Sequence, residues 1–406
     1  MTVISTPHHS TPLNSAQLAI WIHEARAADP TLYIEHVCFE LRGPLDQDRL
    51  KSALRASLDA HPTLGSQIAW GATGLLVVPG RFTVEVDFRS APKPDLTSVL
   101  AAESLAGVCR EGPLCRCLVI EVTPSHHILL FVWHHLAMDG QGIRVLLRDL
   151  ASAWSGLPVR PEATSYPANG SLLDQGNSSV TQRAAVIAER LADLDPQPLP
   201  RRHGCLDESL FVPVDEPILG LAVAAKALHV TVPMLLNAAY QSAIGDVLNL
   251  GKFLLGCITA GRIPVEADDT VGCFINTVLQ RADSNPVGLL RRSSLEFARA
   301  LGDQDVSAGD VATQLLAGLN PRPNSFPQLY LSVDELVGLA LDGLDCRRLW
   351  IRHAQPKFDV SLALEYSANR VTGTLHYRAA ILAPDMAQQL AAAFLVRLHG
   401  IVASGR

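Results

Sequence analysis

The sequence predicts a mixed α/β protein made of two lobes. The chain has 406 residues, of which 48% are hydrophobic, so it is long enough for two cores in lobes of about 200 residues each. Patterns typical of strands and of helices are mixed in both halves, which favours sheets covered by helices. We assign residues 1–172 to an N-terminal lobe and 173–406 to a C-terminal lobe. The boundary falls in a stretch rich in Pro, Gly, Ser and Asn between 156 and 179.

The first lobe is expected to end in a buried strand followed by an amphipathic helix. Its predicted elements are a helix from Ser15 through Ile22, a strand over 33–41, a helix opened by Pro44 and Asp46, strands over 117–122 and 128–133, and a helix after Gly140. The strand over 128–133 is apolar throughout, as in strands buried on both faces. Residues 134–140 therefore lie between a buried strand and a helix, where catalytic groups are common.

The second lobe shows the same mixture, and no tandem repeat is visible in the chain. Its predicted elements are helices over 181–194 and 232–248, the latter capped by Thr231, strands over 253–259, 278–281, 328–333, 358–366 and 371–377, and a terminal helix opened by Pro384. The stretch 196–217 is rich in proline, like the connection between the lobes.

Composition excludes several classes of protein. The net charge is −7 and no basic patch stands out, so we expect no nucleic-acid partner. The longest apolar stretches, such as 128–133, fall short of the roughly 20 residues of a membrane span. The N-terminus lacks the pattern of a signal peptide. We therefore expect a cytoplasmic monomer that does not bind a membrane.

The cysteines do not indicate a metal or redox site. Cys115 and Cys117 are expected to share one face of a strand, but no Cys-x-x-Cys pair occurs. No carboxylate–histidine spacing supports a metal ion either. Buried free thiols, with no bound metal or cofactor, are the interpretation that we adopt.

Residues 134–140 are the strongest candidate for chemistry. Adjacent His134 and His135 point in opposite directions at the end of a strand, so one can face the core and the other a cleft. An imidazole with a pKa near 6.5 suits proton transfer near neutral pH. Gly140 permits a tight turn after Asp139. The structural alternative is that Asp139 caps the following helix and that both histidines are buried structural residues. We interpret His126 and His127 as surface histidines in a turn.

Five segments in order resemble the condensation domains of nonribosomal peptide synthetases, members of the chloramphenicol acetyltransferase-like superfamily. Residues 134–140 resemble the His-His-x-x-x-Asp-Gly signature. The other matching segments are 15–21 (the opening Ser-x-Ala-Gln-x-x-x-Trp-like motif), 41–46 with the following helix and His61, the pair Gly261-Arg262 with 272–281, and 357–360 (Lys-Phe-Asp-Val). The resemblance covers nearly the whole chain.

The resemblance implies two acetyltransferase-like lobes in a V-shaped pseudo-dimer around a central tunnel. It makes His135 the catalytic histidine, and gives His134, Asp139, Gly140 and Arg262 a structural role. In particular, it implies an ion pair between Asp139 and Arg262. Asn276 and Thr277 become candidates for the tunnel wall.

The function implied is acyl transfer from a phosphopantetheine thioester on a carrier protein to an amine, forming an amide. No cofactor is expected on the chain itself, because the phosphopantetheine arm belongs to the partner carrier protein. Two alternatives stay open: an ester-forming enzyme with a hydroxyl acceptor, and a non-catalytic domain that recruits a carrier protein or an enzyme. His135 can act as a base or can orient the acceptor, and the acceptor can be free or bound to a carrier.

Several blocks depart from the family pattern. Residues 60–65 lack both arginines of the Arg-His-Glu-x-Leu-Arg block, and Gln141-Gly142 replaces the common Trp-Ser. The linker around Tyr166 lacks its aromatic block, and only Gln304-Asp305 is left of a His-Gln-Asp block. These losses predict a divergent member whose donor and carrier binding differ from those of typical modules. The sequence also shows no adenylation signature and no Asp-Ser-Leu carrier motif, so we expect a free-standing protein or one domain of a larger synthetase.

Overall fold

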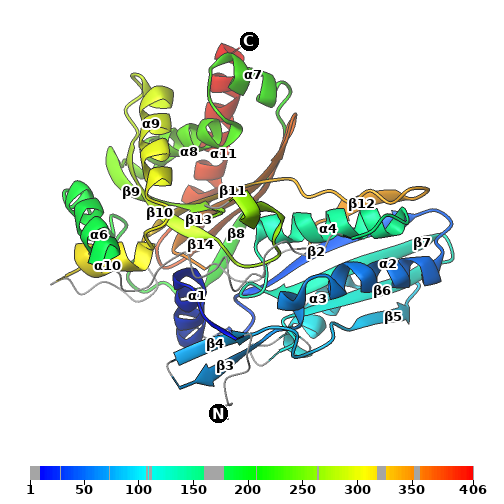
Figure 1. Cartoon of the computed structure of the whole chain (residues 1–406). Coiled ribbons are helices and arrows are strands. Elements are labelled where there is room, and N and C mark those ends of the chain that lie inside the picture. Colours follow the sequence, from blue (N-terminus) through cyan, green and yellow to red (C-terminus); the bar gives the residue numbers. More distant parts are fainter. Residues whose placement is uncertain are drawn as a thin grey trace. The chain divides into compact units, whose positions relative to one another are not determined.

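The chain forms two compact units. The computed structural model describes residues 10–27, 29–72, 74–106, 108, 112–159, 178–206, 208–262, 265–317, 326–351 and 357–405 (Figure 1). Unit 1 comprises Met1–Gln175, Arg262–Ile275 and Val337–His353, and unit 2 comprises Gly176–Gly261, Asn276–Leu336 and Ala354–Arg406. The predicted boundary at 172/173 lies outside the described residues. Two segments from the second half of the chain belong to unit 1, which the sequence did not predict.

Unit 1 is built on a five-stranded sheet with the order β12-β2-β7-β6-β5. The strands are β2 (Ile34–Arg42), β5 (Val86–Ser90), β6 (Cys115–Thr123), β7 (His126–His134) and β12 (Asp345–Leu349). Neighbouring strands are antiparallel except for the β5–β6 pair. Because β12 pairs with β2, a segment from late in the chain completes the edge of this sheet.

Helices cover both faces of the unit 1 sheet. Helices α2 (Gln47–Asp59) and α4 (Gly140–Trp154) lie side by side over one face, and α3 (Leu96–Ala106) contributes to the core on the other (Figure 1). Central strand β7 supplies both cores, because successive side chains point to opposite faces. Leu129, Phe131 and Trp133 join the first core, and Leu130 and Val132 join the second.

The rest of unit 1 is small. It consists of β1 (Thr11–Pro12), α1 (Ser15–Arg26), η1 (Pro62–Gly65), β3 (Gln67–Gly71), β4 (Gly74–Val78) and η2 (Val265–Asp269). Strands β1, β4 and β3 form a separate antiparallel sheet.

Unit 2 is built on a six-stranded sheet with the order β10-β9-β11-β13-β14-β8. The strands are β8 (Ser209–Pro217), β9 (Lys252–Thr259), β10 (Asn276–Asp283), β11 (Leu329–Glu335), β13 (Val360–Ser367) and β14 (Arg370–Arg378). Strand β11 runs parallel to both of its neighbours, and the other pairs are antiparallel. The helices are α6 (Ser178–Leu191), α7 (Leu221–Ala227), α8 (Val232–Leu248), α9 (Leu289–Gly302), α10 (Ala308–Leu315) and α11 (Pro384–Ser404).

Most predicted elements are present, but the proline-rich stretch 196–217 contains a strand that the sequence did not predict. Asp46, Asp139 and Thr231 cap the helices predicted to follow them. The stretch 196–217 is not only a connection, because it contains the nine-residue strand β8. Strand β8 lies at the edge of its sheet, where a proline that cannot donate a hydrogen bond is tolerated. The linker residues 160–177, including Tyr166, lie outside the described residues.

Helix α11 is long and apolar enough to cross a membrane by length and composition alone. In unit 2, however, Leu390, Phe394 and Leu398 are buried in the core shared with α8. Its outer side carries Arg397, which pairs with Asp246 at 2.6 Å. This amphipathic packing is that of a helix that contributes to the core of unit 2.

Candidate active site

The signature loop occupies residues 135–139, between strand β7 and helix α4, entirely within unit 1. Backbone hydrogen bonds fix it at both ends. The N–H of His135 donates to the carbonyl of Tyr33 at 2.8 Å, and the N–H of Asp139 donates to the carbonyl of Gly272 at 3.0 Å. The loop is therefore held by two segments that are distant in the sequence.

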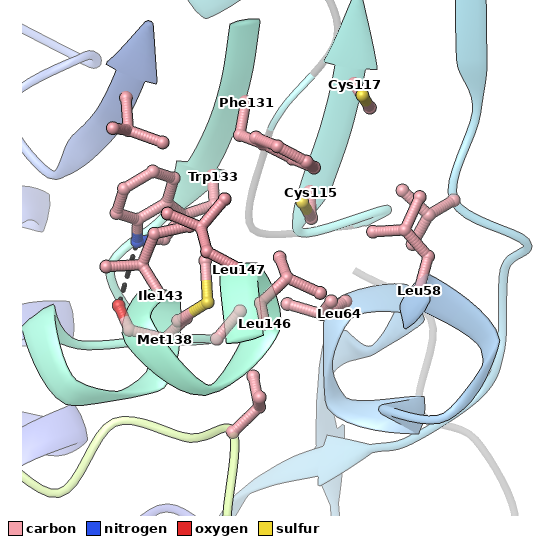
Figure 2. Close-up of a cluster of buried hydrophobic side chains, with 14 of the residues drawn as sticks. Leu58, Leu64, Cys115, Cys117, Phe131, Trp133, Met138, Ile143, Leu146 and Leu147 are labelled. Atoms are coloured by element: carbon pink, nitrogen blue, oxygen red, sulfur yellow. Dashed lines mark hydrogen bonds between the residues drawn. The ribbon is translucent and has the colours of Figure 1, made fainter. Parts of the chain in front are cut away.

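The centre of the loop is part of the hydrophobic core. Leu136, Ala137 and Met138 are fully buried. Figure 2 shows Met138 packed among Trp133, Ile143 and other core side chains, and the indole Nε1 of Trp133 donates to the carbonyl of Met138 at 2.9 Å. Burial of three consecutive apolar residues anchors the loop, so its polar side chains at the two ends are held in place.

His134 points into the protein and is 1% exposed. Its Nδ1 accepts the backbone N–H of Leu136 at 3.1 Å, so the ring proton must lie on Nε2. That Nε2–H donates to Oε1 of Glu24 on α1 at 3.1 Å. Both side chains are buried. The two contacts fix the tautomer and the ring orientation of His134, and its structural role in the site stays a prediction.

His135 is the histidine that is partly exposed. Its ring lies 6.3 Å from the ring of Tyr33, measured between centroids, at an angle of 58°. The hydroxyl of Tyr33 is hydrogen-bonded to Nδ1 of His23 at 2.6 Å. The two histidines thus differ in burial as the alternation of a strand end predicts, and His135 is the one with access to solvent.

Asp139 has both of the roles that the sequence suggested. Its Oδ1 accepts the N–H of Gly142 at 2.8 Å and thereby caps α4. The same oxygen accepts a hydrogen bond from Arg262 at 2.7 Å, while Oδ2 accepts the N–H of Phe274 at 2.9 Å. With side-chain exposures of 1% and 2%, Asp139 and Arg262 form a buried ion pair. The ion pair implied by the resemblance is present.

Arg262 distributes its donors over a second loop. It donates to the carbonyl of Thr270 at 2.8 Å and to the carbonyl of Ala267. Its Cζ lies 4.5 Å from the centroid of the Phe274 ring. One guanidinium therefore ties the signature loop to residues 267–274, as a planar group with several donors can.

Packing requires a glycine at position 142, and the structural role predicted for Gly140 stays a prediction. Gly140 is the first residue of α4. A Cβ on Gly142 would lie 2.6 Å from Cγ of Met138 and 3.4 Å from Oδ1 of Asp139. The departure Gln141-Gly142 is thus matched by Met138, which occupies the space where a side chain would be.

Two buried polar contacts in this region were missed from the sequence. On α1, Nε2 of Gln17 donates to the carbonyl of Leu136 at 2.8 Å. Gln17 belongs to the opening block that marked the family, but that block gave no indication of what it touches. His61, in the block that has lost its arginines, lies 2.9 Å from Oδ2 of Asp149 on α4, and both are buried.

Asn276 and Thr277 lie in unit 2. Asn276 is buried, and its amide donates to the carbonyls of Gln304 and Val306 at 2.7 and 2.9 Å. The hydroxyl of Thr277 is hydrogen-bonded to that of Tyr330. Both amide hydrogens of Asn276 are committed to the chain itself, so its visible role is to hold the 304–306 segment. The assignment of Asn276 and Thr277 to a tunnel wall stays a prediction.

The cysteines behave as buried thiols. All seven that lie in the described part of the chain are free. Burial raises the pKa of Cys115 and of Cys38 to about 12 and also raises that of Cys117, so these thiols are poor nucleophiles at neutral pH. Among the described residues, no cluster of three or more His, Cys, Asp or Glu side chains is placed to hold a metal ion.

The interpretation of His126 and His127 as surface residues of a turn is wrong. Both belong to β7, where His126 lies 2.9 Å from Glu40 and His127 is 1% exposed. Neither ring nitrogen of His127 has a hydrogen-bond partner within the described ranges, and burial lowers its pKa from the ordinary value of 6.5. The turn is shorter than expected because the strand begins two residues earlier.

Comparison with known proteins finds a family match over the N-terminal part of the chain. Residues 8–167 match the Condensation domain family. The chain is 26% identical over 395 residues to the probable nonribosomal peptide synthetase CymA of Salinispora arenicola (strain CNS-205), covering 90% of this chain and 5% of CymA. It covers 16% of bacitracin synthase 2 of Bacillus licheniformis, at 22% identity over 96% of this chain. The chain thus spans only a small part of these synthetases.

Solved structures share the fold over the whole chain. The condensation domain from the monacolin K polyketide synthase MokA aligns with a TM-score of 0.81 and 15% identity, covering 99% of this chain and 98% of that domain. The X-domain from teicoplanin biosynthesis aligns with a TM-score of 0.79 and 19% identity, covering 100% and 98%. Mixed sheets covered by helices, with the signature loop between β7 and α4, give the chain the chloramphenicol acetyltransferase-like fold. The family match and the similar synthetases together support a condensation domain of the nonribosomal peptide synthetase type.

Proposed function

We propose that the chain transfers an acyl or aminoacyl group from the phosphopantetheine thioester of a carrier protein to an amine. The observation that carries this proposal is the contrast within the loop. His134, Asp139 and the three apolar residues between them are buried and tied down, whereas His135 alone among the loop's titratable groups is partly exposed. A fixed loop that presents one imidazole is suited to act on a bound substrate.

The chemistry requires little from the protein beyond alignment and proton handling. The amine nitrogen attacks the thioester carbonyl, the C–N bond forms, the C–S bond breaks, and the thiol leaves with the proton that the amine gives up. His135 removes that proton or holds the amine by a hydrogen bond. General base catalysis contributes typically about 10²–10⁴-fold. A hydroxyl acceptor would give an ester by the same steps.

The test is product formation from an acyl-loaded carrier protein with free and carrier-bound amines and alcohols, followed by mass spectrometry. We expect His135→Ala to lower kcat by about 10²–10⁴-fold with an unchanged melting temperature. His135→Gln keeps a hydrogen-bonding side chain but no base. Recovery of kcat in His135→Gln therefore indicates orientation of the acceptor, and a loss equal to that of alanine indicates a base. Full activity of His135→Ala contradicts the proposal.

The acceptor that gives product distinguishes three reactions: transfer to a free amine, condensation between two carrier proteins, and ester formation. Product with free amines supports a diffusing acceptor, and product only with tethered amines supports a condensation between two carriers. Product with alcohols alone favours the ester-forming alternative.

A second candidate is recruitment without catalysis. The observation in its favour is the similarity of the whole chain to the X-domain, which has been solved in a complex with OxyB from teicoplanin biosynthesis. This candidate predicts no product with any acceptor, together with stable binding of an enzyme of the same biosynthetic pathway. Turnover abolished by His135→Ala contradicts it.

A further inference from the structure

Side chains on one face of helix α1 and at its N-cap contact the signature loop and two residues beside it, His134 and Cys273. Asn14, Gln17 and Glu24 are spaced by three and seven residues, so they share one face of the helix. Asn14 donates to the carbonyl of Cys273 at 3.0 Å, Gln17 donates to the carbonyl of Leu136 at 2.8 Å, and Glu24 accepts from His134 at 3.1 Å. The first two contacts bind backbone, whereas Glu24 binds the side chain next to the catalytic candidate.

The Glu24 contact differs from a surface pair because it is buried. The side chains of Glu24 and His134 are 4% and 1% exposed. A buried carboxylate is costly unless it is hydrogen-bonded, and His134 cannot turn away without also giving up the N–H of Leu136. The ring of His134 is thus held from both sides, by the loop's own backbone and by α1.

We propose that Glu24 is a positioning residue for acyl transfer, which acts through His134 to fix His135. This inference rests on the proposed function. His134 and His135 share a peptide bond, and the N–H of His135 donates to Tyr33. The ring of His134 also accepts the N–H of Leu136, so its release frees the peptide bond that follows His135 and shifts the imidazole of His135. A displacement of about 1 Å at a reacting group can cost about 10²-fold in rate.

Two substitutions separate position from charge. Glu24→Gln keeps an oxygen acceptor at the same distance and loses the charge, and we expect it to keep most of kcat. Glu24→Asp keeps the charge but withdraws the carboxylate by one methylene. We expect it to lower kcat by about 10–100-fold while KM for the acyl carrier stays unchanged. The opposite order, full kcat in Glu24→Asp and loss in Glu24→Gln, overturns the proposal, because the charge would then matter and the position would not.

A matched control removes a different buried carboxylate from unit 1. Glu103 on α3 is 5% exposed and pairs with Arg89 at 2.8 Å, away from the loop. Glu103→Gln and Glu103→Asp should change the melting temperature but not kcat. Equal kcat losses at Glu24 and Glu103 would show a general effect of stability and overturn the proposal. If His135→Ala abolishes turnover but both Glu24 variants keep it, this inference fails alone. If His135→Ala is fully active, the proposed function fails.

Discussion

Each unit contains a β-hairpin that leads through a short connection into a helix. The connection in unit 1 carries polar side chains, whereas the connection in unit 2 is apolar. In unit 1, hairpin β6–β7 leads through residues 135–139 into α4, and in unit 2, hairpin β13–β14 leads through residues 379–383 into α11. The hydrogen bonds correspond. His134 N–H donates to Leu114 and Arg378 N–H to Asp359, His135 N–H donates to Tyr33 and Ala379 N–H to Glu208, and Ala137 N–H donates to His134 and Ile381 N–H to Arg378.

The two polar side chains of the unit 1 loop have apolar counterparts in unit 2. Unit 2 has Ala379 where unit 1 has His135, and Ala383 where unit 1 has Asp139. Helix α11 begins with Pro384 and has no side-chain cap, whereas Asp139 caps α4. The connection in unit 2 shows that this turn folds from apolar residues alone. The polar groups of unit 1 are therefore not needed to make the turn, which is consistent with their serving the site.

The largest effect is expected when Asp139 of unit 1 is replaced by alanine, the residue at the corresponding position of unit 2. Asp139→Ala leaves Arg262 buried without its counter-ion, so we expect a loss of about 3–5 kcal/mol in the free energy of unfolding. Urea titrations of Asp139→Ala, Arg262→Met and the double variant measure it. The double variant should recover part of the loss, because no unpaired charge is left. Strictly additive losses would show that the two residues are not coupled.

A second exchange concerns the second strand of each hairpin, where His127 near the start of β7 corresponds to Val371 near the start of β14. Burial lowers the pKa of His127 below 6.5, so the unfolded chain binds a proton that the folded chain does not. Stability should fall as pH drops below 6.5, by up to about 1.4 kcal/mol per pH unit, until the pKa of the folded state is reached. His127→Val should lose less stability between pH 7.5 and pH 5 than the wild type, as measured by urea midpoints. Identical pH profiles would contradict this prediction.

The smallest effect is expected for the reverse exchange in unit 2. Ala383→Asp places a capping carboxylate before α11, whose N-cap side chain makes no hydrogen bond. We expect a gain of about 0.5–2 kcal/mol in the stability of unit 2. Hydrogen exchange of the α11 amides reports it locally, with Ala383→Asn as an uncharged control. A loss of stability would mean that the chain at residue 383 cannot orient a cap.

The sequence predicts the parts of this molecule that are local and periodic. The apolar run of β7, the stripe of α4 and the signature residues between them are readable, and the family pattern links Asp139 with Arg262. Contacts that depend on the packing of distant segments are not. Glu24 resembles any helix residue until α1 is placed against His134, and His127 resembles a turn residue until β7 is seen to start at His126. Strand β12 is short and carries Arg347 and Arg348, so only its pairing with β2 identifies it.

The route of the chain sets the order in which the site is completed during synthesis. Asp139 and Arg262 are 123 residues apart, so at about 5–20 residues per second the ribosome adds the arginine about 6–25 s after the aspartate. In that interval the carboxylate of Asp139 can cap α4, but its counter-ion Arg262 has not yet been made. Strand β12, which closes the edge of the same sheet, is made later still. The signature loop is thus synthesised well before the residues that complete its contacts.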